Sequence, residues 1–224
     1  MKLVERELGL EIQLKENIVS VIVIEDISLR LSIIEELYSQ IMGKEGNWLL
    51  VENEKNYEIS KKADLILEPF TLELNNKKAK TKLYQDIKTI AQDFSFSQGL
   101  ELHSHICSYL ENLLERVSYP VKYNEEWNIL ELLKAYGVEL CEECDSICEK
   151  IFNYIKLIAD VCGINIFITV NIKHYLTSEQ ISELYKLAKY SKIHLILIEF
   201  NMCGDKYDCE KVYVIDKDNC IITF

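Results

Sequence analysis

Four lysines lie within six residues of one another: Lys77, Lys78, Lys80 and Lys82. If this segment begins a helix, the lysines oppose the positive end of the helix dipole, at a cost of roughly a few tenths of a kcal/mol each. Local stability therefore does not account for them. Lysine clusters of this kind suit phosphate groups, and we expect these four residues to bind DNA. The alternative is an ordinary solvated helix face.

Oxygen-bearing side chains gather in two later segments. The first holds Asn124, Glu125 and Glu126, and the second holds Glu139, Glu142, Glu143 and Asp145. Calcium takes six to eight oxygen ligands in flexible geometry, so such segments can bind it without the spacing of an EF-hand. We predict a metal site built from Asn124, Glu125, Glu126 and Glu139. Solvated carboxylates are the alternative interpretation.

The patterns of common enzymes are missing from the sequence. The turn after Ile24 reads Glu-Asp-Ile-Ser and has neither the glycines nor the lysine of a phosphate-binding loop. Cys141, Cys144 and Cys148 lack the second pair that a closed zinc site needs. Cys148 and Cys162 fall on the apolar stripe of one expected helix, which favours buried thiols. We therefore expect no catalytic residue and no enzyme. A metal-dependent nuclease that uses Glu25, Asp26 or the Glu125–Glu126 pair is kept as an alternative.

Two amphipathic segments must position the lysines and the acids. Apolar residues recur on one helical face between Lys77 and Phe94, and again between Leu102 and Val117. On the first of these helices, Lys77, Lys78 and Lys82 fall opposite the apolar face. Because the linker 95–97 is short, the spacing predicts an antiparallel helical hairpin.

Strand and helix patterns alternate on both sides of this hairpin. Buried strands are expected at 18–24, 164–170 and 193–199, and an edge strand at 10–14. Further strands are expected at 48–51, 64–67, 138–140, 211–215 and 221–224, and helices at 27–42, 129–136, 145–162 and 177–189. This alternation predicts an α/β fold with an inserted helical leg. We expect a head of residues 1–75 and 123–224, and a leg of residues 76–122.

Overall charge limits where DNA could bind. The 224 residues include 25 Lys+Arg and 37 Asp+Glu, for a formal net charge of −12. An acidic protein of this kind must confine any DNA contact to a small basic patch. The longest apolar runs are far shorter than the ~20 residues of a membrane helix, and eight cysteines are too dilute for a disulfide scaffold. We expect a cytoplasmic protein with reduced thiols and no membrane partner.

Several segments carry a resemblance to a known family: Val21–Ile27 (VIVIEDI), Ile129–Leu140 (ILELLKAYGVEL), Val170–Glu199 and Lys211–Asp218 (KVYVIDKD). They resemble the CRISPR-associated type II-A adaptation proteins, in their short form. The resemblance implies a head related to P-loop ATPases but without nucleotide binding, and a helical leg. It also implies a ring-shaped homotetramer that binds double-stranded DNA ends without sequence preference and acts in spacer acquisition, a part of antiviral defence.

The same resemblance implies a cofactor and partners. Tyr123–Glu126 stands where the family has an acidic calcium-binding segment, so calcium is the expected ion. Other CRISPR adaptation proteins and the RNA-guided nuclease are the expected protein partners. A ring would let lysines line a hole for the DNA phosphates while the acidic surface stays outside. The alternative is a protein–protein adaptor of the adaptation complex that does not bind DNA directly.

Overall fold

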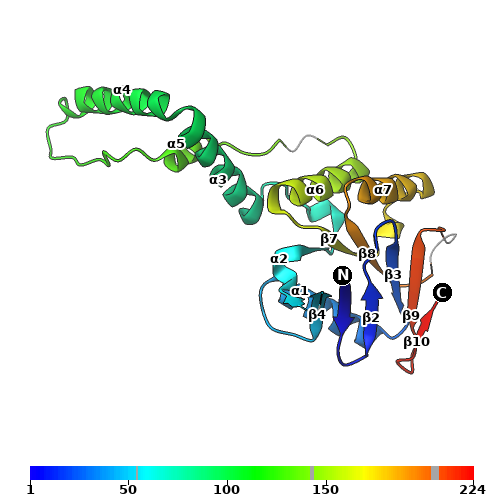
Figure 1. Ribbon diagram of the computed structural model, residues 1–224. Helices are drawn as coiled ribbons and strands as arrows, with labels where there is room; N and C mark the ends of the chain where they lie inside the picture. Colours follow the sequence, from blue (N-terminus) through cyan, green and yellow to red (C-terminus); the bar gives the residue numbers. More distant parts are fainter. Residues whose placement is uncertain (54, 142–143, 203–206) are drawn as a thin grey trace. The chain divides into compact units, whose positions relative to one another are not determined.

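The computed structural model describes residues 1–53, 55–141, 144–202 and 207–224 (Figure 1). The chain divides into two units. Residues Met1–Leu74 and Glu142–Phe224 form the first unit, which we call the head. Residues Asn75–Cys141 form the second, which we call the leg. The leg is thus wider than the expected 76–122, because residues 123–141 belong with it and not with the head.

A six-stranded sheet organises the head, in the order β10-β9-β3-β8-β7-β6. Its strands are β3 (Val19–Ile24), β6 (Ala63–Ile66), β7 (Ile166–Val170), β8 (His194–Glu199), β9 (Glu210–Ile215) and β10 (Ile221–Thr223). All neighbours pair in parallel except β10 with β9. Every residue of β3 and of β7 is buried, as in a parallel sheet covered on both faces. The predicted α/β class is therefore confirmed.

A smaller antiparallel sheet was not predicted as a separate layer. It has the order β2-β1-β4-β5, with strands β1 (Lys2–Glu5), β2 (Leu10–Gln13), β4 (Trp48–Glu52) and β5 (Lys55–Tyr57). The edge position of β2 agrees with its alternation of buried and exposed residues. Strands β1 and β5 were missed because four and three residues are too few to show a period.

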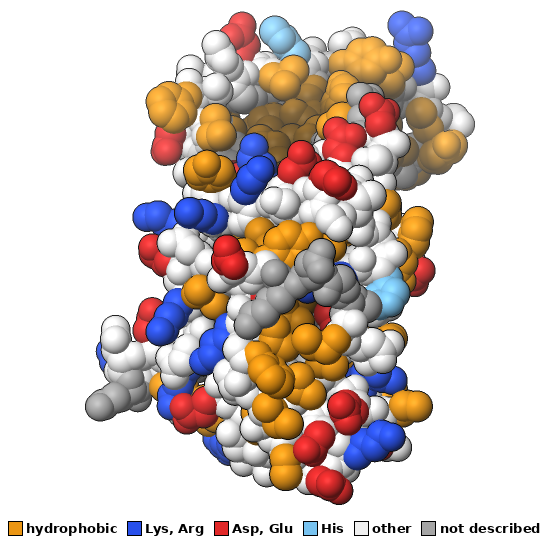
Figure 2. All heavy atoms as spheres, turned by 90° about the vertical axis from the view of Figure 1, so that its right-hand side faces the viewer, with side chains coloured by type: hydrophobic (Ala, Val, Ile, Leu, Met, Phe, Trp, Pro, Cys, Tyr) orange, Lys and Arg blue, Asp and Glu red, His pale blue; other side chains and the backbone are white. Residues whose placement is uncertain are grey.

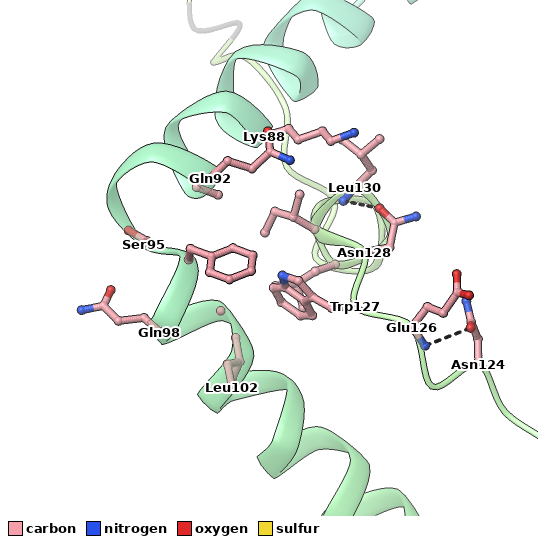
Figure 3. Close-up of a pocket in the computed structure, with 15 residues that line it drawn as sticks. Lys88, Gln92, Ser95, Gln98, Leu102, Asn124, Glu126, Trp127, Asn128 and Leu130 are labelled. Atoms are coloured by element: carbon pink, nitrogen blue, oxygen red, sulfur yellow. Dashed lines mark hydrogen bonds between the residues drawn. The ribbon is translucent and has the colours of Figure 1, made fainter.

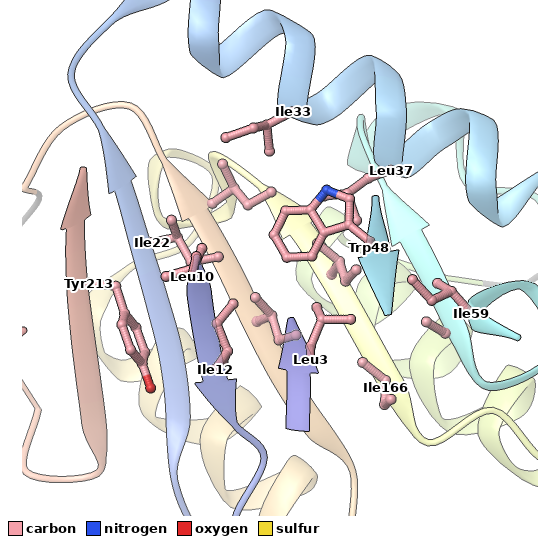
Figure 4. Close-up of a cluster of buried hydrophobic side chains, with 14 of the residues drawn as sticks. Leu3, Leu10, Ile12, Ile22, Ile33, Leu37, Trp48, Ile59, Ile166 and Tyr213 are labelled. Atoms are coloured by element: carbon pink, nitrogen blue, oxygen red, sulfur yellow. The ribbon is translucent and has the colours of Figure 1, made fainter. Parts of the chain in front are cut away.

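Helices cover both faces of the larger sheet. They are α1 (Ile27–Ile41), α2 (Ile59–Lys62), α6 (Ile147–Cys162) and α7 (Ser178–Tyr190), with short 3-10 turns η1 (Pro69–Thr71) and η2 (Ile172–His174). One face of the sheet packs against α1 and the smaller sheet around Trp48, Leu37 and Ile22 (Figure 4). Helices α6 and α7 pack on the other face, where Ile155 and Leu184 are buried. The site-bearing segments therefore start from a rigid core.

Helix ends follow the sequence signals closely. Thr177 and Gln180 form the predicted capping box at the start of α7. Gly163 ends α6 in the left-handed conformation at φ 65°. The N-cap of α6 is Ser146, whose hydroxyl accepts from the Glu149 N–H, and the expected Asp145 lies one residue outside. The strand expected at 138–140 is absent from this described segment, which is irregular.

The leg contains α3 (Lys77–Phe94), α4 (Phe96–Leu114) and α5 (Ile129–Ala135). The predicted antiparallel hairpin of α3 and α4 is wrong. Only Ser95 separates the two helices, and one residue cannot reverse the chain, which needs two to five. The chain therefore bends at Ser95, and the irregular segment after α4 returns toward α5 (Figure 1).

The bend leaves much of the predicted apolar face of the leg uncovered. Helix α4 has no buried residue. The exposed fractions are 56% for Ile90, 83% for Phe94 and 58% for Phe96. Amphipathic helices of this kind bury their apolar face against a neighbour, and α3 and α4 do not provide that neighbour for each other.

Candidate nucleic-acid interface

The lysine cluster lies at the start of α3, as its spacing indicated. Asn76 caps this helix, because its side-chain oxygen accepts from the N–H of Ala79 at 3.0 Å. Lys77, Lys78 and Lys82 are exposed, whereas Ala79 between them is buried. The helix therefore buries one side of its first turn and presents the lysines on the other.

Carboxylates neutralise part of this cluster. The Lys80 ammonium lies 2.6 Å from Oε1 of Glu139, and that of Lys82 lies 2.6 Å from Oδ1 of Asp86. Among the described residues, Lys77 has no ion-pair partner. Lys80 and Glu139 were predicted for two different sites, one for DNA and one for a metal, and the fold pairs them with each other. Exposed pairs of this kind are worth roughly 0–1 kcal/mol, so a phosphate can displace either carboxylate.

The face drawn in Figure 2 shows how these charges are distributed more widely. Lys and Arg side chains lie among Asp and Glu side chains there, with hydrophobic groups between them. This mixture agrees with the excess of acidic residues in the sequence. A DNA contact is therefore a local property of particular lysines.

The predicted acidic segment, residues 124–126, contacts α4 through His103. The Nε2 atom of His103 lies 2.8 Å from the backbone oxygen of Glu125. The ring of Trp127 lies against His103, with 5.6 Å between ring centroids. The Asn124 side chain accepts from the N–H of Glu126 at 3.1 Å. Backbone and ring contacts thus hold the segment, while the Glu125 and Glu126 side chains remain exposed.

The described parts of the structure do not bring the predicted calcium ligands together into one group. In the described parts of the chain, no three His, Cys, Asp or Glu side chains gather closely enough to hold a metal ion. Glu139 is paired with Lys80, and Asn124 closes a local turn. Glu142 and Glu143 lie outside the described residues. Calcium needs six to eight oxygens, so its binding at Asn124, Glu125, Glu126 and Glu139 stays a prediction.

A pocket of about 550 Å³ lies beside the bend of the leg (Figure 3). Phe96, Leu102, Trp127 and Leu130 supply apolar walls, and polar groups such as Gln92 stand at its rim. Trp127 fits because position 99 is glycine: a Cβ there would lie 3.2 Å from the indole ring. This pocket was not predicted from the sequence. A glycine inside an amphipathic helix was the available signal, since it marks a close approach.

The turn between β3 and α1 does not form a phosphate-binding loop. The Asp26 carboxylate caps α1 and accepts from the Leu29 N–H at 2.7 Å, in the place where a phosphate would otherwise bind. The Arg30 guanidinium faces the backbone oxygens of Ile24 and Phe200 and the ring of Phe200. Asp26 thus acts as the N-cap of α1.

The cysteines agree only in part with the prediction of buried thiols. Cys148 is buried in α6, where desolvation raises the pKa of its thiol and keeps it protonated. Cys162 is partly exposed, although the helical spacing placed it on the same apolar stripe. Among the described residues, no helix is long and apolar enough to cross a membrane.

Comparison with known proteins gives one family and a set of distant structures. The family model described as "CRISPR-associated protein (Cas_Csn2)" matches residues 40–219. A curated relative, "CRISPR-associated protein Csn2" of Streptococcus agalactiae, is 25% identical over 209 residues, which cover 91% of this chain and 90% of the relative.

Among solved structures, cbiO1 of Clostridium perfringens, part of an ABC transporter complex, matches with a TM-score of 0.49 and 16% identity. That match covers 96% of this chain and 79% of cbiO1. The ATP-binding cassette MJ1267 matches with a TM-score of 0.45 and 13% identity, over 96% and 82% of the two chains. Both TM-scores are below 0.5, and no conclusion about this chain rests on them.

Proposed function

Since the chain belongs to the Csn2 family of CRISPR-associated proteins, we propose that it is a non-catalytic clamp that binds double-stranded DNA ends during spacer acquisition. The observation that supports DNA contact is the lysine cluster at the start of α3, with Lys77, Lys78 and Lys82 exposed. These cations oppose the helix dipole, so a role outside the chain explains them better than helix stability does. Lysine contacts to phosphates carry no sequence information, which agrees with binding that ignores sequence.

We propose further that the clamp is a ring of four copies. The uncovered apolar side chains of the leg, above all Phe94 and Phe96, support self-association. Apolar surface exposed over two successive helices is unusual for a monomer, and a second copy would remove it from water. Four copies also multiply the lysine cluster without any new residue.

A gel-shift comparison of linear with covalently closed plasmid tests the clamp. Threading predicts binding to linear DNA and little binding to the closed form. Equal binding to both forms would refute threading. No binding to either would refute the DNA role and favour the adaptor of the adaptation complex that does not bind DNA.

The lysines are tested by Lys77→Gln, Lys78→Gln and Lys82→Gln together. If each contacts a phosphate, the triple variant binds linear DNA more weakly, and the slope of log affinity against log salt falls by about one per lost contact. Lys186→Gln, Lys189→Gln and Lys192→Gln together are the matched control, because these three lysines of the head are also exposed and their change removes the same number of charges. Equal losses in both variants would show a general charge effect and refute a local DNA site.

The nuclease alternative has its own assay. Linear DNA is incubated with the chain and magnesium or manganese, and the products are separated by size. We expect uncut DNA. Cleavage that is lost in Glu25→Gln, or in Glu125→Gln with Glu126→Gln, would overturn the non-catalytic proposal.

A further inference from the structure

Helix α1 has two apolar faces, and the fold uses only one of them. On the inner face Ile33 and Leu37 are buried in the core. Gln40 is buried beside them, where its amide exchanges two 3.0 Å hydrogen bonds with the backbone of Trp48. These contacts fix the rotation of the helix about its axis. The outer face is therefore set by the fold and cannot turn inward.

The outer face carries a continuous apolar stripe, which we call the α1 stripe. It consists of Ile27, Leu31, Tyr38 and Met42, with exposed fractions of 70%, 56%, 47% and 63%. At 100° per residue these four positions fall within an arc of about 60°, and at 1.5 Å per residue they span about 22 Å. Packing of the head does not require them, because the core is closed by the inner face.

Large apolar residues gathered on one side of a soluble protein mark an interaction surface more often than scattered ones do. In the α1 stripe, Ile27 with Leu31 and Tyr38 with Met42 form two i, i+4 pairs. Such pairs are the ridges that pack into the grooves of another helix. The stripe thus has the shape of one half of a helix–helix contact.

The charges around the stripe indicate which helix would fit. Residues 25–45 include five acidic and two basic side chains. Glu25, Glu35 and Glu45 are exposed beside or beyond the stripe. Arg30, one of the two cations, is directed at the backbone oxygens of Ile24 and Phe200. An exposed apolar ridge flanked by carboxylates complements a helix with apolar residues and lysines or arginines.

We propose that the α1 stripe docks a cationic amphipathic helix of a partner protein. Proteins that handle nucleic acid carry basic surfaces, and membership of a CRISPR-associated family places this chain among such proteins. A second copy of the chain fits less well. In a two-fold antiparallel pair of α1 helices, Glu35 near the helix centre would face its own counterpart, and like charges would oppose contact. The stripe belongs to the head, whereas the apolar residues invoked for self-association belong to the leg.

Two synthetic helical peptides provide the probe. They share leucines at i, i+4, i+7 and i+11 and differ in carrying lysine or glutamate at all other exposed positions. Binding to the full chain is followed by fluorescence anisotropy of a labelled peptide. We expect the lysine peptide to bind at least tenfold more tightly than the glutamate peptide.

Because any cationic peptide is attracted to an acidic protein, the variants decide the outcome. Leu31→Ser with Tyr38→Ser, both at exposed positions, should lower the affinity of the lysine peptide at least tenfold. Ile90→Ser with Phe94→Ser, matched apolar changes on the leg, should leave that affinity unchanged. Circular dichroism checks that each variant is folded.

Two results would overturn the proposal. The first is a lysine peptide that binds the Leu31/Tyr38 variant as tightly as the original chain. The second is a solution mass that falls in the Leu31/Tyr38 variant and not in the Ile90/Phe94 variant, which would show that a second copy covers the α1 stripe. Loss of DNA binding leaves both measurements unaffected, so this test is separate from that of the clamp.

Discussion

Glu199 offers the sharpest test of how the head is built. It ends β8 with only 1% of its surface exposed. One carboxylate oxygen accepts from the Lys173 N–H at 3.2 Å, and the other has no hydrogen-bond partner among the described residues. The Lys173 ammonium goes instead to Glu210 at 2.7 Å, which also accepts from the Tyr185 hydroxyl at 2.5 Å. Two buried carboxylates therefore share one buried cation.

Desolvation is the main reason that the pKa of Glu199 rises from 4.5 to about 7, and nearby Glu210 adds to the rise. The folded chain then holds a proton that the unfolded chain releases near pH 4.5. This proton stabilises the fold fully below pH 4.5, and its contribution is lost as the pH rises through 7. One pKa unit corresponds to about 1.4 kcal/mol, so the contribution falls by about 2–3 kcal/mol between pH 5 and pH 8.

Glu199→Gln removes the titration and keeps the oxygen that accepts from Lys173. Urea unfolding of the variant and the original chain at pH 5 and pH 8 gives two differences in unfolding free energy. We expect the unfolding free energy of the variant to rise by about 2–3 kcal/mol relative to that of the original chain on going from pH 5 to pH 8. Glu183→Gln, an exposed carboxylate on α7, is the control and should show no such gain. A difference for Glu199→Gln that is the same at both pH values would refute the argument.

Three further predictions follow from single contacts. Lys173→Met leaves Glu210 without its cation and should lower the unfolding free energy, measured in urea, by about 3–5 kcal/mol. Adding Glu210→Gln should restore part of this free energy, and no recovery would refute the pairing. Glu139→Gln removes the carboxylate beside the Lys80 ammonium and should raise DNA affinity in calcium-free buffer by up to about fivefold, whereas weaker binding would contradict the displacement of Glu139 by phosphate. Gly99→Val forces the Trp127 ring to move and should destabilise the leg by about 1–3 kcal/mol. The movement should shift the tryptophan fluorescence, whereas Ser97→Val, at an exposed position of α4, should not shift it.

Regular elements of the head could be predicted because each has a local signal. The apolar run at Val19–Ile24 is long enough to identify a buried parallel strand. Thr177 with Gln180, and Gly163, place helix ends from side-chain chemistry that acts within a few residues. The strands of the smaller sheet were harder, because the short sequences of β1 and β5 carry no period, although each pairs with a strand next to it in the chain.

The candidate site was predictable in its residues and not in its pairings. Lys80 and Glu139 are 59 positions apart, and no local pattern shows that they meet at 2.6 Å. The helical periods of α3 and α4 are correct, yet a period does not say which neighbour covers an apolar face. The single linker residue between α3 and α4 determines that these helices do not cover each other, because one residue is too short for the chain to reverse.

The sequence by itself determined the α/β class, the buried strands, the lysines at the start of α3 and the likeness to a CRISPR-associated family. These depend on residue types at short separations, where propensity, period and capping act. Only the tertiary structure decided that Glu139 neutralises Lys80, that Glu199 lies buried with an unpaired oxygen, and that α1 leaves an apolar stripe in water. Such features depend on which distant segments the packing of two sheets and their helices brings together, and no single segment encodes that.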